Sequence, residues 1–284
     1  MLHTHRPSKR IAIFICCLIM TSLVVVPVFF TLNNSFKTDS QSLNNSFSLP
    51  APATLSNYKY VIIEKSILRY AKNSFLVCCF GLWFCAAINP FVSFMIVNHW
   101  EKRIYHVLYV ILSACMFIPA NLLLFPIIRQ FYNWNLMNRL GLILYYAAFV
   151  MPESVFMLVP FMRTFNRSIR DAALLDGCTR MKYYLYIFLP MCRSINITVL
   201  IFNAVWMWND FFMPLMVLNR DPDIWTLPIY IYSYLGRNTT HRNIAFAACW
   251  LALLPIIILY LFFHKRIIHG LYMQFTKIDN TIIR

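Results

Sequence analysis

The sequence predicts an all-α, polytopic membrane protein with six transmembrane helices. Of its 284 residues 60% are hydrophobic and only 12% are charged, whereas roughly a quarter of the residues of a soluble domain are charged. Crossing the hydrocarbon core of a bilayer takes about 20 mostly apolar helical residues. Apolar stretches long enough to span it cover residues 11–32, 73–97, 104–128, 140–162, 194–218 and 243–264.

The first stretch could instead be a signal peptide, because a basic leader precedes it. Its apolar run, residues 11–32, is longer than the usual signal core, and no small-x-small cleavage motif follows closely. We therefore expect a division into a cytoplasmic leader with a peripheral first transmembrane helix, a Ser/Asn/Pro-rich extracytoplasmic loop, a five-helix core and a cytoplasmic tail. These parts correspond to residues 1–32, 33–69, 70–264 and 265–284.

The distribution of positive charge predicts the orientation of the chain. With six helices both termini lie on one side, and the segments on that side carry fifteen of the 25 Lys and Arg residues. Because Lys and Arg accumulate in cytoplasmic loops, both termini are expected in the cytoplasm. The net charge of +15 thus indicates topology and contact with membrane lipid, and no nucleic-acid partner is expected.

Enzyme chemistry has little support in the sequence. There is no HExxH or GxSxG motif, and none of the nine cysteines has CxxC spacing, so we expect no catalytic residues, no metal site and no cofactor. A phosphate-binding P-loop needs two glycines five apart with Lys after the second, and no pair among the five glycines has this spacing. If the protein uses ATP, a partner subunit must bind it.

The longest charged stretch is the loop of residues 163–193, which is expected in the cytoplasm. Arg163, Arg167 and Arg170 are spaced to share one helix face, and a helix end facing lipid headgroups is one interpretation of them. The run from Asp171 to Asp176 favours a short helix, which Gly177 would end in a left-handed conformation.

An aromatic, amphipathic segment follows in the same loop. Residues 183–190 read YYLYIFLP, which is typical of a helix lying at the membrane interface. We expect the chain to turn from this segment into the fifth span at Pro190.

The order Asp171-Ala172-Ala173, then Asp176-Gly177, then Ile187-x-Leu189-Pro190 resembles the EAA loop of ABC importer permeases. Other segments are similar to carbohydrate-uptake permeases of the maltose-transporter type. These are Tyr58, Asn73-Ser74, Ile118-Pro119 and the run from Trp208 to Leu215. The resemblance covers most of the chain and implies the type I ABC importer permease fold.

The resemblance implies a permease subunit in a bacterial plasma membrane that forms half of a pathway for a sugar or oligosaccharide. Its partners would be a cytoplasmic ABC ATPase dimer, a second homologous permease and an extracytoplasmic solute-binding protein. The short helix would sit in a cleft of the ATPase and transmit its closure to the spans. The implied coupling residues are Arg170, Asp171, Ala172, Ala173, Asp176, Gly177 and Pro190.

Four residues depart from the pattern of that family. Asp171 replaces the usual Glu, Asn166-Arg167 stands where the family often has Ile-Pro, and Gln274 stands where a second Gly is common in the tail. These departures leave open the contacts of Asp171 and of the tail with the ATPase.

Polar residues within the spans are candidates for the translocation pathway, because ionisable groups in a membrane are costly and usually functional. They are Asn73, Glu153, Asn209 and Asp210. Asp210 could instead order the turn towards Pro214, and aromatic rings at Tyr146, Trp206 or Trp208 could stack on a sugar. A self-contained secondary transporter or channel is the alternative function, although we find no inverted repeat.

Overall fold

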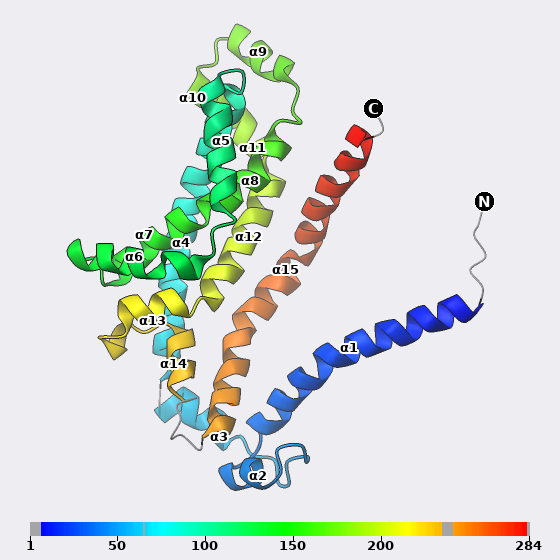
Figure 1. Ribbon diagram of the computed structural model, residues 1–284, viewed down its shortest axis with the longest axis vertical. Helices are drawn as coiled ribbons and strands as arrows, with labels where there is room; N and C mark the ends of the chain where they lie inside the picture. Colours follow the sequence, from blue (N-terminus) through cyan, green and yellow to red (C-terminus); the bar gives the residue numbers. More distant parts are fainter. Residues whose placement is uncertain (1–6, 65, 235–240, 283–284) are drawn as a thin grey trace. The chain divides into compact units, whose positions relative to one another are not determined.

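The computed structural model describes residues 7–64, 66–234 and 241–282. Within these ranges every regular element is helical and no β-strand occurs (Figure 1), which confirms the predicted all-α class. The elements are α1 Pro7–Ser35, α2 Asp39–Asn44, α3 Ser56–Lys59, the π-helix η1 Tyr60–Glu64, α4 Ile67–Asn98, α5 Arg103–Cys115, α6 Ala120–Asn133, α7 Arg139–Phe149, α8 Met151–Met162, α9 Arg167–Leu175, α10 Arg180–Tyr183, the π-helix η2 Tyr184–Phe188, α11 Leu189–Met191, α12 Arg193–Asn209, α13 Phe212–Leu218, the 3₁₀ helix η3 Pro222–Ile224, α14 Leu227–Ser233 and α15 Arg242–Ile282.

Four stretches are long and apolar enough to cross a membrane as single candidate spans. They cover Ile13–Ser35, Ile67–Asn98, Arg139–Met162 and Arg242–Phe263. Two further spans are possible as bent pairs, Arg103–Cys115 with Ala120–Asn133 and Arg180–Met191 with Arg193–Asn209. Counting each bent pair as one span gives six in the described residues.

The structure interrupts two of the expected spans. The helices on either side of residues 116–119 meet at 101°, where one helix over residues 104–128 was expected. The cause is Pro119, which lies directly before α6 and has an extended backbone (φ −60°, ψ 128°). A proline disfavours helix in the residue before it and donates no backbone hydrogen bond. The expected span 194–218 is likewise broken after Asn209, where Asp210 is extended (φ −65°, ψ 129°).

The described chain forms two compact units, and most of α4 to α13 belongs to the unit of residues 70–229 with 255–284. Its largest core cluster centres on the buried side chains of Tyr146 on α7, Met207 on α12 and Met213 on α13. Gly81 on α4 permits close contact here, since an added Cβ would lie 3.2 Å from Met207 Sδ. In a membrane such van der Waals fit between helices matters more than transfer of apolar surface from water.

The other unit, residues 1–69 with 230–254, is organised by buried amides and one lysine. Lys37 is fully buried and its Nζ donates hydrogen bonds to the carbonyls of Asn45 (3.0 Å) and Ser46 (2.9 Å). Asn57 Nδ2 donates to Lys37 O at 2.8 Å, and Asn243 Nδ2 donates to Lys37 O and to Asn57 Oδ1, both at 3.0 Å. Burial lowers the pKa of Lys37. The polar loop thus has a defined structure held to the start of α15.

Candidate functional site

The charged loop begins with the nine-residue helix α9. Asn166, in extended conformation, caps its start, and its Oδ1 accepts a hydrogen bond of 3.0 Å from Ser168 N. Asparagine is a preferred N-cap because its side chain satisfies a backbone N–H that the helix leaves free. The helix therefore begins at Arg167, four residues before the expected start at Asp171. Asn166 was the local signal for this start.

The predicted helix stop at Gly177 is confirmed. Gly177 has a φ of +81°, its N–H donates to Leu174 O at 3.1 Å, and the N–H of Cys178 donates to Ala173 O at 3.0 Å. This pair of bonds with a left-handed residue is the Schellman motif, which glycine adopts at least cost. Across residues 7–64, 66–234 and 241–282 no atom lies within 4 Å of a Cβ added at Gly177, so within this part of the chain glycine is required for its backbone conformation.

The two alanines of α9 face different surroundings. Ala173 is only 7% exposed and packs within an aromatic cluster of the chain itself, so its small size serves an internal contact. Asp171 and Ala172 are exposed. Leu175, which sequence reasoning did not single out, is an apolar side chain that is 88% exposed at the end of α9.

Phe94 on α4 anchors the loop to a membrane span. Its ring centroid lies 4.9 Å from that of Tyr184, 5.0 Å from that of Phe188 and 6.1 Å from that of Tyr183. Ala173 belongs to the same buried cluster. The underside of α9 is therefore packed, through aromatic rings, against the last turns of α4.

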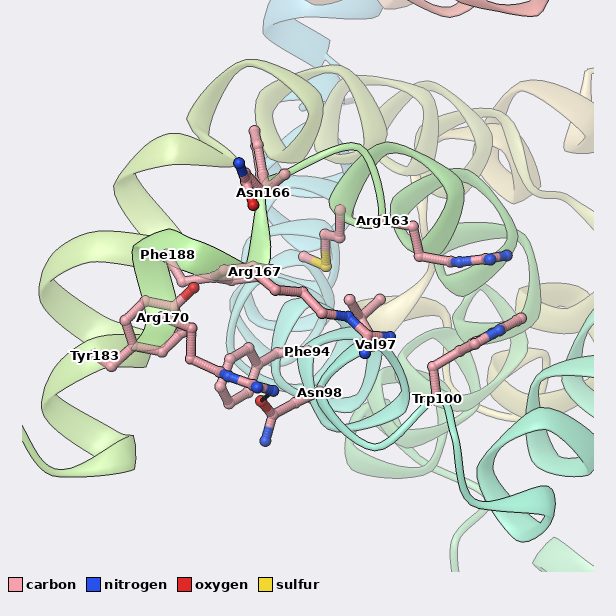
Figure 2. A pocket seen from close by; sticks show the side chains of 12 residues that line it. Phe94, Val97, Asn98, Trp100, Arg163, Asn166, Arg167, Arg170, Tyr183 and Phe188 are labelled. Carbon is pink, nitrogen blue, oxygen red and sulfur yellow. Dashed lines mark hydrogen bonds between the residues drawn. The ribbon is translucent and has the colours of Figure 1, made fainter. Parts of the chain in front are cut away.

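The prediction that the three arginines share one helix face was wrong, because Arg163 caps the end of α8 whereas Arg167 and Arg170 lie on α9. They nevertheless line one pocket with the end of α4 (Figure 2). Arg170 Nη2 pairs with Asp171 Oδ1 at 2.9 Å, and Arg170 Nη1 donates to Asn98 Oδ1 at 3.2 Å. Arg167 and Arg163 each contact a residue that sequence reasoning missed. Glu101 pairs with Arg167, and the guanidinium of Arg163 lies 4.0 Å from the ring centroid of Trp100.

Pro190 lies in the short helix α11, directly after the π-helix Tyr184–Phe188. Beyond it the axis bends by 74° into α12. A proline ring clashes with the carbonyl four residues earlier and removes one helical hydrogen bond, and π-turns and prolines are the usual sites of such kinks. The expected turn at Pro190 is therefore present.

Three of the four expected pathway residues line one cavity of about 640 Å3. Glu153 comes from α8, Asn209 ends α12 and Asp210 follows it. The remaining wall is aromatic or aliphatic, and consists of Ile201, Phe202, Val205, Trp206, Phe211 and Phe212. Carboxylates and an amide beside aromatic rings can hydrogen-bond and stack on a polyhydroxylated ring.

Glu153 and Asp210 differ in their surroundings. Glu153 is exposed and also lines a second cavity of about 270 Å3, so its carboxylate borders both spaces. Asp210 lies beside the Tyr146 hydroxyl and the first backbone N–H groups of α13, which agrees with a role in the turn. Its Oδ2 is buried and has no hydrogen-bond partner in the part of the chain that the structure describes, so the turn uses only part of this carboxylate.

The structure does not bring Asn73 to this cavity. Its Nδ2 donates to the carbonyls of Asp223 and Trp225, both at 2.9 Å, and its Oδ1 accepts from Arg139 Nη2 at 2.8 Å. The neighbouring Ser74 Oγ accepts from Leu227 N at 2.8 Å. These bonds join the start of α4 to the start of α7, to the segment before α14 and to the first residue of α14. Tyr146, suggested for stacking on a sugar, is only 1% exposed and belongs to the core.

Comparison with known proteins identifies the class that this fold and loop define. A solved bacterial ABC transporter involved in the import of the acidic polysaccharide alginate has a chain that superposes with a TM-score of 0.76 at 18% identity, over 92% of this chain and 98% of that one. The described chain therefore shares the fold of that transporter chain.

The family follows from sequence. The model of the family of binding-protein-dependent transport system inner membrane components matches residues 88–271, and the chain belongs to this family. It is 31% identical over 251 residues to the multiple sugar-binding transport system permease protein MsmG of Streptococcus mutans, with 88% of this chain and 90% of MsmG covered. It is also 31% identical over 248 residues to the diacetylchitobiose uptake system permease protein NgcG of Streptomyces coelicolor, with 86% and 82% covered. The protein is therefore a multi-pass permease of an ABC importer.

Proposed function

We propose that this permease forms half of the translocation pathway for a sugar or oligosaccharide and that residues 171–177 couple it to a separate cytoplasmic ATPase. The observation that carries the proposal is the build of α9. It has a capped start, a Schellman stop and an outer surface with exposed Asp171, Ala172 and Leu175. A short helix that exposes a leucine at its end is suited to insertion into a cleft of another protein.

Packed side chains connect α9 to the helices α4 and α12. Ala173 contacts the cluster that contains Phe94 of α4 and Ile195 and Val199 of α12. Because packed interiors deform little, displacement of α9 moves these helices with it. The bend after Pro190 is a place where α12 can change direction relative to the loop.

The proposed solute rests on the relatives and on the cavity. MsmG and NgcG are named for the transport of sugars and of diacetylchitobiose. The cavity of about 640 Å3 combines Glu153, Asn209 and Asp210 with the rings of Phe202 and Trp206. This composition suits a neutral carbohydrate, and it does not select one sugar among many.

The proposed assembly contains two ATPase subunits, a second homologous permease and a solute-binding protein outside the membrane. The family's description as binding-protein-dependent supports the last of these. The charge distribution supports an orientation with α9 and both termini in the cytoplasm. The division into a peripheral first helix, an outer loop, a five-helix core and a tail is proposed on the same basis, and catalysis is assigned to the ATPase alone.

Reconstitution together with site-specific photocrosslinking tests the proposal. A benzoyl-phenylalanine crosslinker is placed at Leu175, which is 88% exposed, and as a control at Tyr186, which is 78% exposed in the same loop. We expect ATPase adducts at residue 175 and few at 186, and sugar flux only when the ATPase and second permease are present. Solute flux through this chain alone would support a secondary transporter or channel, and adducts confined to residue 186 would exclude coupling through α9.

A further inference from the structure

The pocket beneath the start of α9 is lined by three cationic side chains and no acidic one. It has a volume of about 140 Å3, many times the space needed for one water molecule. Figure 2 shows Arg163 lying beside Trp100 and Arg170 pointing at Asn98. The full lining is Phe94, Val97, Asn98, Trp100, Met162, Arg163, Phe165, Asn166, Arg167, Arg170, Tyr183 and Phe188.

The acids around this pocket neutralise only part of its charge. Glu101 pairs with Arg167 and Asp171 pairs with Arg170, and neither acid belongs to the lining. Arg163 makes no ion pair within the described ranges. Its guanidinium contacts the face of Trp100, an arrangement that fixes the group by cation–π attraction and leaves N–H donors along its edge.

The position of the pocket matches the level of lipid headgroups. It lies where two membrane spans end, at Asn98 on α4 and Met162 on α8. Its other wall is apolar and includes Phe94, Val97 and Phe165. Basic pockets between transmembrane helices are suited to anionic headgroups, and aromatic side chains are enriched at this depth.

We propose that this pocket binds the phosphate of one anionic phospholipid, with the guanidinium groups of Arg163 and Arg167 on the phosphate and the acyl chains leaving along the apolar wall. Glu101 and Asp171 supply two negative charges against the three positive charges of the arginines, and a bound phosphate would neutralise the remaining positive charge. Since Arg167 is the first residue of α9, the lipid would fix the start of that helix. The assignment to the inner leaflet rests on the orientation proposed above, whereas the binding itself does not depend on coupling to an ATPase.

Quenching of tryptophan fluorescence by brominated lipids tests this site without a transport assay. The full chain is placed in nanodiscs of phosphatidylcholine, and brominated phosphatidylglycerol is titrated in, with brominated phosphatidylcholine as the comparison. We expect brominated phosphatidylglycerol to quench the fluorescence more than brominated phosphatidylcholine does. This excess quenching should disappear in the variant Trp100→Phe. Arg163→Gln should weaken the apparent affinity about fivefold, as expected for one arginine at a membrane surface. Arg180→Gln is the matched control, because Arg180 is exposed in the same loop and does not line the pocket.

Each outcome decides the assignment. Equal weakening by Arg163→Gln and Arg180→Gln, or excess quenching that survives in Trp100→Phe, would overturn a discrete site. Competition by inorganic phosphate or glycerol 3-phosphate at concentrations similar to those of the lipid would show a soluble anion as occupant. Loss of the excess quenching when the ATPase is added would show that the ATPase, and no lipid, fills the pocket in the assembled transporter. Coupling failure with intact quenching would reject the proposed function and leave this site standing.

Discussion

Arg139 Nη2 donates a hydrogen bond of 2.8 Å to Asn73 Oδ1, while the Nδ2 of the same amide holds the carbonyls of Asp223 and Trp225. One side chain that is 4% exposed thus joins the starts of α4 and α7 to the segment before α14. The bonds link residues up to 152 positions apart. Asn73 therefore has a structural role that its position near the start of a span did not reveal.

The variant Asn73→Ala should lower the free energy of unfolding by about 2–3 kcal/mol, because it leaves buried polar groups without partners. Thermal unfolding of the purified chain in nanodiscs measures the effect. Asn133→Ala, at an exposed asparagine of α6, should change the midpoint little. Equal midpoints for the two variants would show that the three hydrogen bonds add nothing to stability.

Substitutions of Gly177 separate backbone strain from partner contact. A residue with a Cβ at a φ of +81° costs about 1–2 kcal/mol, and asparagine tolerates this conformation better than alanine. No atom of the described residues would lie within 4 Å of the new Cβ. We therefore expect Gly177→Ala to reduce sugar-stimulated ATP hydrolysis of the assembled transporter more than Gly177→Asn. An equal loss in both would mean that the ATPase surface leaves no room for a side chain.

Asp171 should be replaceable by the acid that the family usually has. It orients Arg170 through bonds of 3.0 and 2.9 Å from Nε and Nη2, and the longer side chain of a glutamate can reach the same guanidinium. We expect Asp171→Glu to preserve uptake and Asp171→Lys to abolish co-purification of the ATPase at normal expression. Glu64→Lys, an exposed acid outside the loop, serves as the charge-matched control. Full uptake in Asp171→Lys would remove this residue from the coupling set.

Neutralising Glu153 should affect transport and not assembly. Its carboxylate lines the cavity of about 640 Å3 and lies outside the aromatic cluster beneath α9. The variant Glu153→Gln should reduce uptake by roughly ten- to 150-fold, because a hydrogen bond from the solute to a carboxylate contributes about 1.5–3 kcal/mol. ATPase co-purification and uptake are measured on the same membranes. A parallel loss of both would point to a folding role instead.

The buried position of Lys37 predicts that the free energy of unfolding rises at alkaline pH. Burial lowers the pKa of Lys37 in the folded state below its ordinary value of 10.5. At pH values between these two pKa values the unfolded chain binds more protons than the folded chain. The free energy of unfolding therefore rises with pH in that interval. A neutral amine keeps two N–H donors, enough for the carbonyls of Asn45 and Ser46. The variant Lys37→Gln should retain donors and lose the pH dependence, as measured by unfolding midpoints from about pH 7 to about pH 10.5. If the unfolding midpoint of the variant still depended on pH in the same way, the pH dependence would come from other groups.

The features predicted from sequence were those that depend on local signals. Apolar runs predicted spans, and Gly177 predicted the stop of α9, because hydropathy and a left-handed cap need no distant partner. The roles of Asn73 and Ala173 were missed, since their partners lie far away in sequence. Two further features follow from local sequence and were not predicted. Asn166 is the N-cap of α9, and Pro119 separates α5 from α6.

The hydrogen bonds of Asn243 carry a consequence for biosynthesis. Its Nδ2 reaches the carbonyl of Lys37, 206 positions earlier, and the side chain of Asn57. A ribosome releases the chain from its N-terminus, so neither earlier residue can meet Asn243 until translation has passed position 243. The hydrogen bonds that join this loop to α15 can form only after the start of α15 has been synthesised, which makes closure of the loop a late event in biosynthesis.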